Sequence, residues 1–335
     1  MTQKTILLTG ATGYIGSHAV VAFEQAGYKT VIIDNFINSS TDSLQGISKI
    51  LWYIPDFYEG DIRDRWFLIS IFEKYSFDVV VHFAWLKAVG ESCDHPNMYH
   101  DNNIWWSIHL FWVMQEFWVK KIIFSSSATV YRADNNSPFT ENMPLGTTNP
   151  YGTTKLLIEY LLQDMVQQKD WSVIALRYFN PIWAHPSGYI GEVPNWIPNN
   201  LLPYLLDVAS GKRESVNVYG NDYDTIDGTG LRDYVDVCDL VEAHIRAYEK
   251  LDAGYEAINI GTGKGTSVFQ MIKYVEQASG KVLPYVICPR RSWDIATVYC
   301  DPTLAQKKLG WSTKTSTIQS VKNGWLFIQN QKFYV

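Results

Sequence analysis

The stretch TGATGYIGSH near the start of the chain constrains its fold more than any other part of the sequence. It follows an apolar run at residues 6–8 and places three glycines three residues apart, at Gly10, Gly13 and Gly16. A strand, this glycine pattern and an amphipathic segment at 17–26 predict a tight strand-to-helix turn that a ligand approaches closely. Because the first N–H groups of a helix are unpaired and carry the positive end of its dipole, a phosphate is the expected ligand.

Asp34 extends this pattern, because it follows the second apolar run at 30–33, about 20 residues after the glycines. A carboxylate at this place accepts a hydrogen bond from an adenosine ribose 2′-OH and repels a 2′-phosphate. The stretch therefore predicts NAD rather than NADP. The alternative is a tight turn whose later aspartate only caps a helix.

The first half of the chain alternates between short apolar runs and longer segments with helical spacing. The runs lie at 5–8, 30–33, 79–83 and 121–124. Because parallel strands need long crossover connections, this rhythm predicts an α/β fold, a Rossmann-type doubly wound parallel sheet. Residues 181–200 are rich in Pro, Gly and Asn and break the rhythm. We expect a nucleotide-binding domain over 1–180, with 233–258 returning to it, and a smaller mixed α/β lobe from 181–232 and 259–335.

Composition excludes several classes of function. The net charge of -6 offers no general attraction for nucleic acid or an anionic membrane. Four cysteines far apart, without a C-x-x-C pair, indicate reduced thiols in a cytoplasmic protein and no metal site. The Trp-rich stretch at 104–124 contains charged residues that are costly at bilayer depth, so it predicts a buried or interfacial helix followed by a strand.

Tyr151 and Lys155 form the pattern Y-x-x-x-K, which places both side chains on one face of a helix. An ammonium group beside a phenol, together with a nicotinamide cation, lowers the phenol pKa from its usual value near 10 and lets the phenolate take a hydroxyl proton. Taken alone, such a pair is more often an ordinary surface contact. The glycine motif in the same chain favours the catalytic interpretation.

Longer segments resemble one known family. The glycine spacing, the triplet GDI at 60–62, HFAWLKAVGES at 82–92, AHPSG at 184–188 and IPNN at 197–200 are similar to the extended short-chain dehydrogenase/reductase family, and within it to the UDP-glucose (UDP-galactose) 4-epimerases. The resemblance runs nearly end to end. It implies that Ser127 is the catalytic hydroxyl beside Tyr151 and Lys155. Related dehydratases and decarboxylases carry an acid after this serine, whereas Ala128 and Thr129 stand here.

The resemblance implies an NAD-dependent isomerase that interconverts UDP-galactose and UDP-glucose. The C4 hydroxyl is oxidised transiently to a 4-ketose, and hydride returns to the other face of the sugar. A homodimer in the cytoplasm is expected, without nucleic acid or membrane partners. Two alternatives stay open: an epimerase for UDP-N-acetylhexosamines or another sugar nucleotide, since Val298 leaves room for an N-acetyl group, and a catalytically impaired scaffold that binds NAD or a nucleotide sugar.

The remaining site residues are carried over from the resemblance. The expected NAD contacts, besides Tyr151 and Lys155, are Gly10, Gly13, Tyr14, Ile15, Gly16, Asp34, Asn35, Asn38, Ser39, Asp61, Ile62, Phe83, Ala84, Lys87, Asn102 and Phe179. The expected substrate contacts, besides Ser127 and Tyr151, are Lys87, Asn180, Asn200, Leu201, Asn217, Tyr219, Arg232, Arg291, Asp294 and Val298. The two arginines are expected on the diphosphate, whose charge and geometry suit guanidinium groups.

Tryptophans are the main departure from the family pattern. Six of the thirteen stand where the family usually has a small residue: Trp85, Trp105, Trp106, Trp183, Trp196 and Trp293. An indole at a glycine position obstructs both a positive φ angle and close ligand approach. Trp105, Trp106, Trp112 and Trp118 fall on the helix expected at 104–119, where core packing and a dimer interface are both compatible with the pattern.

Overall fold

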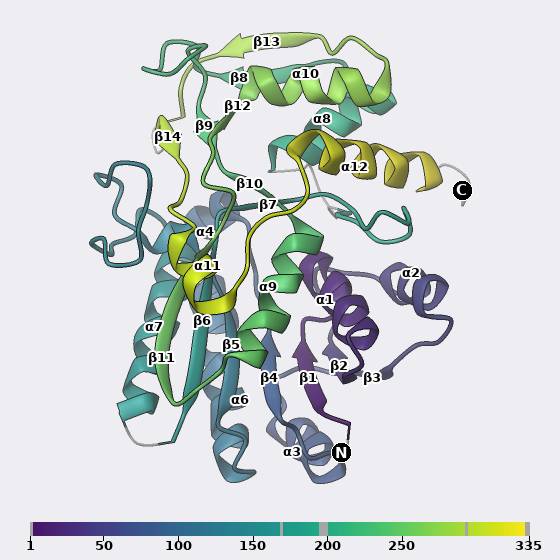
Figure 1. Cartoon of the computed structure of the whole chain (residues 1–335), viewed down its shortest axis with the longest axis vertical. Coiled ribbons are helices and arrows are strands. Elements are labelled where there is room, and N and C mark those ends of the chain that lie inside the picture. The colour runs from purple at the N-terminus through teal and green to yellow at the C-terminus, as the bar shows by residue number, and fades with distance from the viewer. Residues whose placement is uncertain (1–2, 168–169, 194–199, 292–293, 332–335) are drawn as a thin grey trace.

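The computed structural model of the chain describes residues 3–167, 170–193, 200–291 and 294–331 (Figure 1). Trp196 and Trp293, which the sequence singled out, lie outside these ranges.

A seven-stranded sheet forms the centre of the protein, with the order β11-β6-β5-β4-β1-β2-β3. Every neighbouring pair is parallel. The strands are β1 (Thr5–Thr9), β2 (Lys29–Asp34), β3 (Asp56–Glu59), β4 (Val79–His82), β5 (Lys121–Ser127), β6 (Ser172–Tyr178) and β11 (Gly254–Ile260). This order confirms the predicted Rossmann-type fold. Strand β5 runs three residues further than the apolar run at 121–124, which carries its end to Ser127.

Helices cover both faces of this sheet (Figure 1). Ile6 and Leu8 of β1 pack with α1 (Tyr14–Gln25), α2 (Asp42–Leu51), α9 (Val237–Glu249) and α11 (Thr303–Leu309). Leu7, between them, faces the other side and packs with α3 (Arg65–Lys74), α6 (Trp106–Glu116) and α7 (Pro150–Gln167). Because side chains alternate along a strand, an unbroken apolar run such as 6–8 is the pattern that a sheet buried on both faces requires.

Three small sheets and three helices form a second lobe. Strand β7 (Asn180–Ile182) pairs with β10 (Tyr234–Asp236), and β8 (Val216–Tyr219) pairs with β13 (Tyr285–Cys288). Strand β9 (Leu231–Arg232) lies between β12 (Thr266–Ser267) and β14 (Thr297–Val298). Helices α8 (Leu201–Ser210), α10 (Val268–Ser279) and α12 (Thr317–Gln331) bury their apolar faces together. The remaining short helices are α4 (Val89–Asp94), α5 (Pro96–Tyr99), the π-helix η1 (His100–Trp105) and the 3-10 turn η2 (Ala128–Val130).

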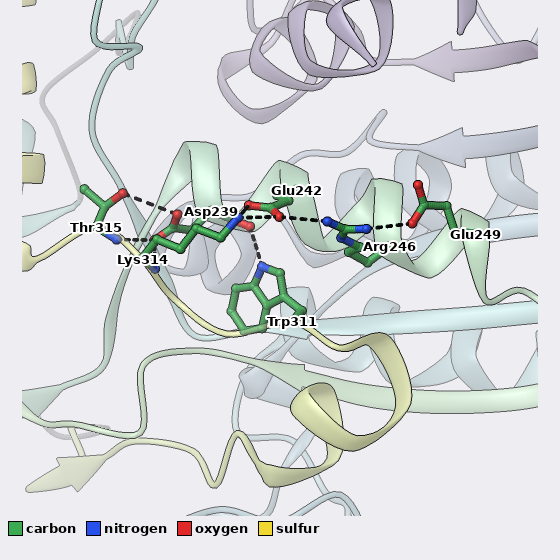
Figure 2. Close-up of polar contacts among 7 residues, drawn as sticks. All are labelled: Asp239, Glu242, Arg246, Glu249, Trp311, Lys314 and Thr315. Atoms are coloured by element: carbon green, nitrogen blue, oxygen red, sulfur yellow. Dashed lines mark hydrogen bonds and ion pairs between the residues drawn. The ribbon is translucent and has the colours of Figure 1, made fainter. Parts of the chain in front are cut away.

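After α11 the chain runs back to the second lobe beside helix α9, and Asp239 of α9 holds this returning segment (Figure 2). The Trp311 indole N–H donates to the Asp239 carbonyl at 2.8 Å, and the backbone N–H groups of Lys314 and Thr315 donate to its carboxylate at 2.9 and 2.8 Å. Helix α11 itself packs against the sheet, although residues 303–309 fall in the range predicted for the smaller lobe. The exact division of the chain into domains stays a prediction.

The helix expected at 104–119 is shorter in the structure, because η1 precedes α6 and α6 ends at Glu116. Its tryptophans differ in burial. Trp106 belongs to the core, whereas Trp105, Trp112 and Trp118 are 50%, 48% and 79% exposed. Within the described ranges, no helix has the length and apolar character that crossing a membrane requires.

Candidate active site

The glycine stretch forms the tight turn that its spacing predicts. Gly10 adopts a φ of +68°, and a Cβ on it would lie 2.6 Å from the backbone of Ala84. A Cβ on Gly16 would lie 2.3 Å from the Gly10 carbonyl oxygen. Helix α1 begins at Tyr14, earlier than residue 17, and its N-cap Gly13 provides no side-chain hydrogen bond. The first N–H groups of α1 therefore have no side-chain cap, which leaves them available to a phosphate.

Asp34 lies at the end of β2 and organises the loop after it. Its carboxylate accepts hydrogen bonds from the N–H groups of Thr12 and Phe36, each at 2.9 Å, and from the Ser39 hydroxyl at 3.0 Å. A carboxylate has about four lone-pair positions, so one acceptor position is left for a ribose hydroxyl. The glycine turn and the free acceptor position of Asp34 fit a dinucleotide such as NAD.

A cavity opens at the carboxyl ends of the strands between these two features, the place where ligands bind in open α/β sheets. Ten of the predicted cofactor residues line it: Gly10, Gly13, Asp34, Asn35, Asn38, Ser39, Ile62, Phe83, Ala84 and Asn102. Five further residues complete the lining: Ile33, Ile37, Gly60, Trp85 and Trp106. Asp61 is not one of these lining residues, but it accepts a hydrogen bond from Asn35, which is.

Other predicted cofactor residues lie elsewhere around the turn. The half-buried Ile15 packs against the core of the sheet, and Gly16 is required by the turn itself. The buried Tyr14 hydroxyl has no hydrogen-bond partner within the described residues, and Lys87 Nζ lies 5.4 Å from the Tyr14 ring centre. Phe179 packs in a separate cluster, described below with the second lobe. These residues lie around the cavity and are not among the residues that line it.

Tyr151, Lys155 and Ser127 come together where α7 passes the end of β5. Lys155 Nζ lies 5.8 Å from the Tyr151 ring centre, as one helical turn predicts. Burial raises the pKa of Tyr151 to about 12, and a hydrogen bond with Ser127 partly offsets that rise. Burial also holds the pKa of Lys155 well below its usual value, with Glu159 acting in the opposite direction.

This electrostatic balance differs from the sequence expectation, in which Lys155 lowers the phenol pKa. The Lys155 ammonium donates to the Ser125 carbonyl oxygen at 2.6 Å. Because both side chains are removed from water, desolvation opposes the charged form of each.

Trp85 explains the orientation of the lysine. The Lys155 Nζ atom lies 3.6 Å from the Trp85 ring centre and 5.2 Å from that of Phe124. The indole N–H donates to the His82 carbonyl at 3.2 Å. Trp85 also lines the cavity, so one indole contacts both the lysine and the space beside the glycine turn.

Two polar residues that the sequence did not single out support this group. Buried Asn103 bonds to both backbone groups of Leu86 and to the Thr154 hydroxyl, so it joins the loop after β4 to helix α7. Thr129 donates through its backbone N–H and its hydroxyl to Ser127 Oγ, at 3.2 and 3.0 Å. With both of its acceptor positions used, the Ser127 hydroxyl keeps its proton for donation to Tyr151. A Thr two residues after a Ser is the local signal for this turn.

A second group of predicted residues gathers in the other lobe. Asp294 accepts from Arg232 at 2.6 Å and from Arg291 at 2.7 Å, so two guanidinium groups share one carboxylate. Arg232 and Val298 are register partners in β9 and β14. The Arg291 guanidinium lies 5.0 Å from the Tyr219 ring centre. Asn217 is exposed on the same side of β8 as Tyr219. This cluster combines excess positive charge with an aromatic face.

Glu192, which the sequence did not single out, links two predicted contacts. It accepts from Lys87 Nζ and from Asn200 Nδ2, each at 2.9 Å. Leu201 follows as the first residue of α8. Asn180 begins β7, with its backbone N–H bonded to the Asp233 carbonyl. Phe179 and Val298 pack into one apolar cluster with Val130 and Tyr131, just after the end of β5. The two lobes are therefore in direct contact beside Ser127.

The fold and the site together define a Rossmann-type protein in which a Ser–Tyr–Lys group stands beside a dinucleotide cavity. Residues 6–261 match the NAD dependent epimerase/dehydratase family. The chain belongs to this family. Within the described residues, no group of His, Cys, Asp or Glu side chains could hold a metal ion.

Relatives and solved structures are similar over nearly the whole chain. The UDP-glucose 4-epimerase of Bacillus subtilis (strain 168) is 49% identical, over 96% of this chain and 95% of the relative. A UDP-glucose-4-epimerase from Stenotrophomonas maltophila, crystallised with NAD and formylated UDP-arabinopyranose, has a TM-score of 0.97 at 40% identity, over 99% of this chain and 100% of that one. The Bifidobacterium longum enzyme in complex with NAD+ and UDP has a TM-score of 0.94 at 44% identity, over 98% and 99%.

Proposed function

We propose that this chain interconverts UDP-galactose and UDP-glucose as an NAD-dependent 4-epimerase. The observation that carries the proposal is the grouping of Ser127, Tyr151 and Lys155 at the carboxyl end of β5, next to the cavity of the glycine turn. The similarity to UDP-glucose 4-epimerases over almost the full chain supports the same substrate pair.

The glycine turn and Asp34 would hold the NAD, with its pyrophosphate at the start of α1 and a ribose hydroxyl on the carboxylate. When bound, NAD supplies a hydride acceptor and donor at C4 of the sugar, so that it is regenerated in each turnover. Tyr151 removes the C4 hydroxyl proton and later returns one. Ser127 donates to the phenolate oxygen and so stabilises the charge that forms on it.

The second lobe would hold the nucleotide while the sugar turns. Arg232 and Arg291 present donors to the diphosphate, and their shared partner Asp294 keeps both guanidinium groups oriented. Tyr219 and Asn217 are proposed to contact the uracil. Firm binding of the nucleotide leaves the hexose free to present either face of C4.

We also propose that the protein is a cytoplasmic homodimer. Exposed aromatic and apolar side chains of η1, α6 and α7, namely Trp105, Trp112, Leu157 and Tyr160, provide a surface for a second copy. Activity on UDP-N-acetylhexosamines is a second candidate, favoured by the modest size of Val298 opposite Arg232.

Incubation of the protein with UDP-galactose, followed by separation of UDP-glucose, tests the main proposal. We expect turnover in the parent protein and in Tyr160→Phe, an exposed tyrosine on the same helix. Tyr151→Phe should retain bound NAD and lose turnover by at least about 100-fold, the contribution typical of a general base. A parent protein that binds NAD without turnover would be a binding scaffold and would contradict the proposal.

A further inference from the structure

Three tryptophans adopt the left-handed backbone conformation that L-residues rarely enter. Among the described residues, five that are not glycine have a positive φ, and three of them are Trp52 at 69°, Trp118 at 59° and Trp183 at 91°. Such angles force a Cβ against the adjacent backbone, and a bulky side chain makes them outliers. The concentration of one large residue type in this conformation requires an explanation.

Trp52 and Trp118 end helices in the way that glycine does. The Trp52 N–H bonds to the Ser48 carbonyl at the end of α2. After α6, the N–H of Trp118 bonds to Gln115 and that of Val119 to Met114, the pairing of a glycine-terminated helix. Their indoles are 90% and 79% exposed. Trp118 makes a surface contact with Lys120 Nζ, 4.9 Å from its ring centre, and neither exposed indole gains the core packing that would offset its backbone strain.

Other helices of the same chain end on glycine at the equivalent place. Gly211, Gly280 and Gly310 follow α8, α10 and α11 with φ angles of 84°, 70° and 64°. No atom lies within 4 Å of a Cβ built on any of them. The space around the Cβ therefore does not determine which residue type ends these helices. The left-handed backbone conformation favours glycine at all five helix ends, those after α2, α6, α8, α10 and α11.

Trp183 shows the same conformation in a buried place. Its indole N–H has no hydrogen-bond partner within the described residues. The ring lies so close to α12 that a Cβ on Gly324 would approach it to 2.0 Å. A buried donor without a partner is unfavourable, so burial does not explain this indole.

Two other tryptophans are buried without backbone strain. Trp171 is buried in the core below β6. Trp311 is buried, and its N–H donates to the Asp239 carbonyl (Figure 2). Neither has a positive φ. Among the described residues, tryptophan therefore occurs at positions whose backbone suits it and at three positions whose backbone does not.

We propose that glycine is the native residue at positions 52, 118 and 183. A UGA triplet explains all three at once, because it is read as tryptophan in some genetic codes and as glycine in others, whereas UGG is tryptophan in all of them. The printed sequence would then show tryptophan at these three positions, whereas the organism that makes the protein inserts glycine there.

The gene sequence and the natural protein test this proposal without any measurement of activity. We expect UGA at 52, 118 and 183 and UGG at 171 and 311. Mass spectrometry of peptides from the protein purified from its own organism should give glycine at the first three positions. UGG triplets there, or peptides with tryptophan, would overturn the proposal.

Purified variants of the tryptophan-containing protein provide a matched test of stability. We expect Trp52→Gly, Trp118→Gly and Trp183→Gly each to raise the thermal unfolding midpoint, because each relieves a left-handed residue. The same change at Trp171 or Trp311 should lower the midpoint through a lost core contact. Equal destabilisation at all five positions would contradict the glycine assignment, whatever the enzyme activity.

Discussion

The Lys155 ammonium lies 3.6 Å from the centre of the Trp85 ring, closer to this indole than to the Tyr151 ring at 5.8 Å. The same indole lines the cofactor cavity. Because the lysine is desolvated and its ammonium faces Ser125, its charge contributes little at the phenol in this arrangement. We therefore expect the position of this indole to influence how the proposed acid–base group is charged.

Trp85→Gly should shift the pH dependence of turnover. Removal of the indole admits water to Lys155 and so raises its pKa towards the usual value. A charged lysine then favours the phenolate, and the acid limb of the kcat profile should move to lower pH. Trp66→Gly, at an exposed position on α3, is the matched control. Identical pH profiles for the parent and Trp85→Gly would show that the indole has no influence on the lysine.

The buried pair of Arg177 and Glu159 should be important for stability. The guanidinium donates twice to the carboxylate, at 2.6 and 3.0 Å, and both side chains are inaccessible to water. Arg177→Met leaves an uncompensated buried charge and should lower the free energy of unfolding by about 3–5 kcal/mol. Arg246→Met, in the exposed network of Figure 2, should cost below about 1 kcal/mol. Urea denaturation separates these values, and similar losses would contradict the assignment.

Buried histidines should make the protein less stable in mild acid. Burial lowers the pKa of His18 to about 3 and that of His244 to about 4. Their pKa values are near 6.5 in the unfolded chain, so the unfolded state binds more protons as pH falls below this value. The stabilisation is complete above pH 6.5 and is lost progressively below it.

Between pH 7 and pH 5 each histidine should contribute a loss on the order of 2 kcal/mol. Urea unfolding at both pH values measures the total. His244→Gln can keep an acceptor for the Tyr178 hydroxyl and should reduce the difference. A variant with the same pH dependence as the parent would show that His244 is not one of the groups responsible.

The two arginines that share Asp294 should determine the affinity for the nucleotide sugar. Arg232→Lys and Arg291→Lys keep the charge but lose the planar fork. We expect each to raise the KM for UDP-galactose about tenfold, equivalent to about 1.4 kcal/mol, with a smaller effect on kcat. Arg290→Lys, which alters the neighbouring pair with Asp222, is the control and should leave KM nearly unchanged. A loss confined to kcat would contradict a binding role.

Features whose residues lie close together along the chain could be predicted from the sequence. The glycine turn and Asp34 are recognisable because spacing along the chain determines their geometry. Asn103 and Glu192 could not be found in this way, since their partners Leu86, Thr154, Lys87 and Asn200 become neighbours only in the folded protein. The orientation of Lys155 was also missed, because a helical spacing gives the shared face but not the partner of the ammonium.

The burial of the tryptophans was beyond prediction for a similar reason. An apolar pattern on α6 does not distinguish a core position from an exposed one, and only the packing of α3 against α6 buries Trp106 while Trp112 stays at the surface. The positive φ of Trp118 could not be foreseen from residue type, because residue type opposes it.

The central claim is that the sugar loses and regains hydrogen at C4 while Tyr151 handles the proton. UDP-galactose that carries deuterium at C4 tests it most directly, with mass spectrometry of the UDP-glucose formed in ordinary water. Hydride that leaves C4 and returns to C4 does not exchange with solvent, so the account predicts full retention of the label in the product. Loss of deuterium to water during turnover would contradict it.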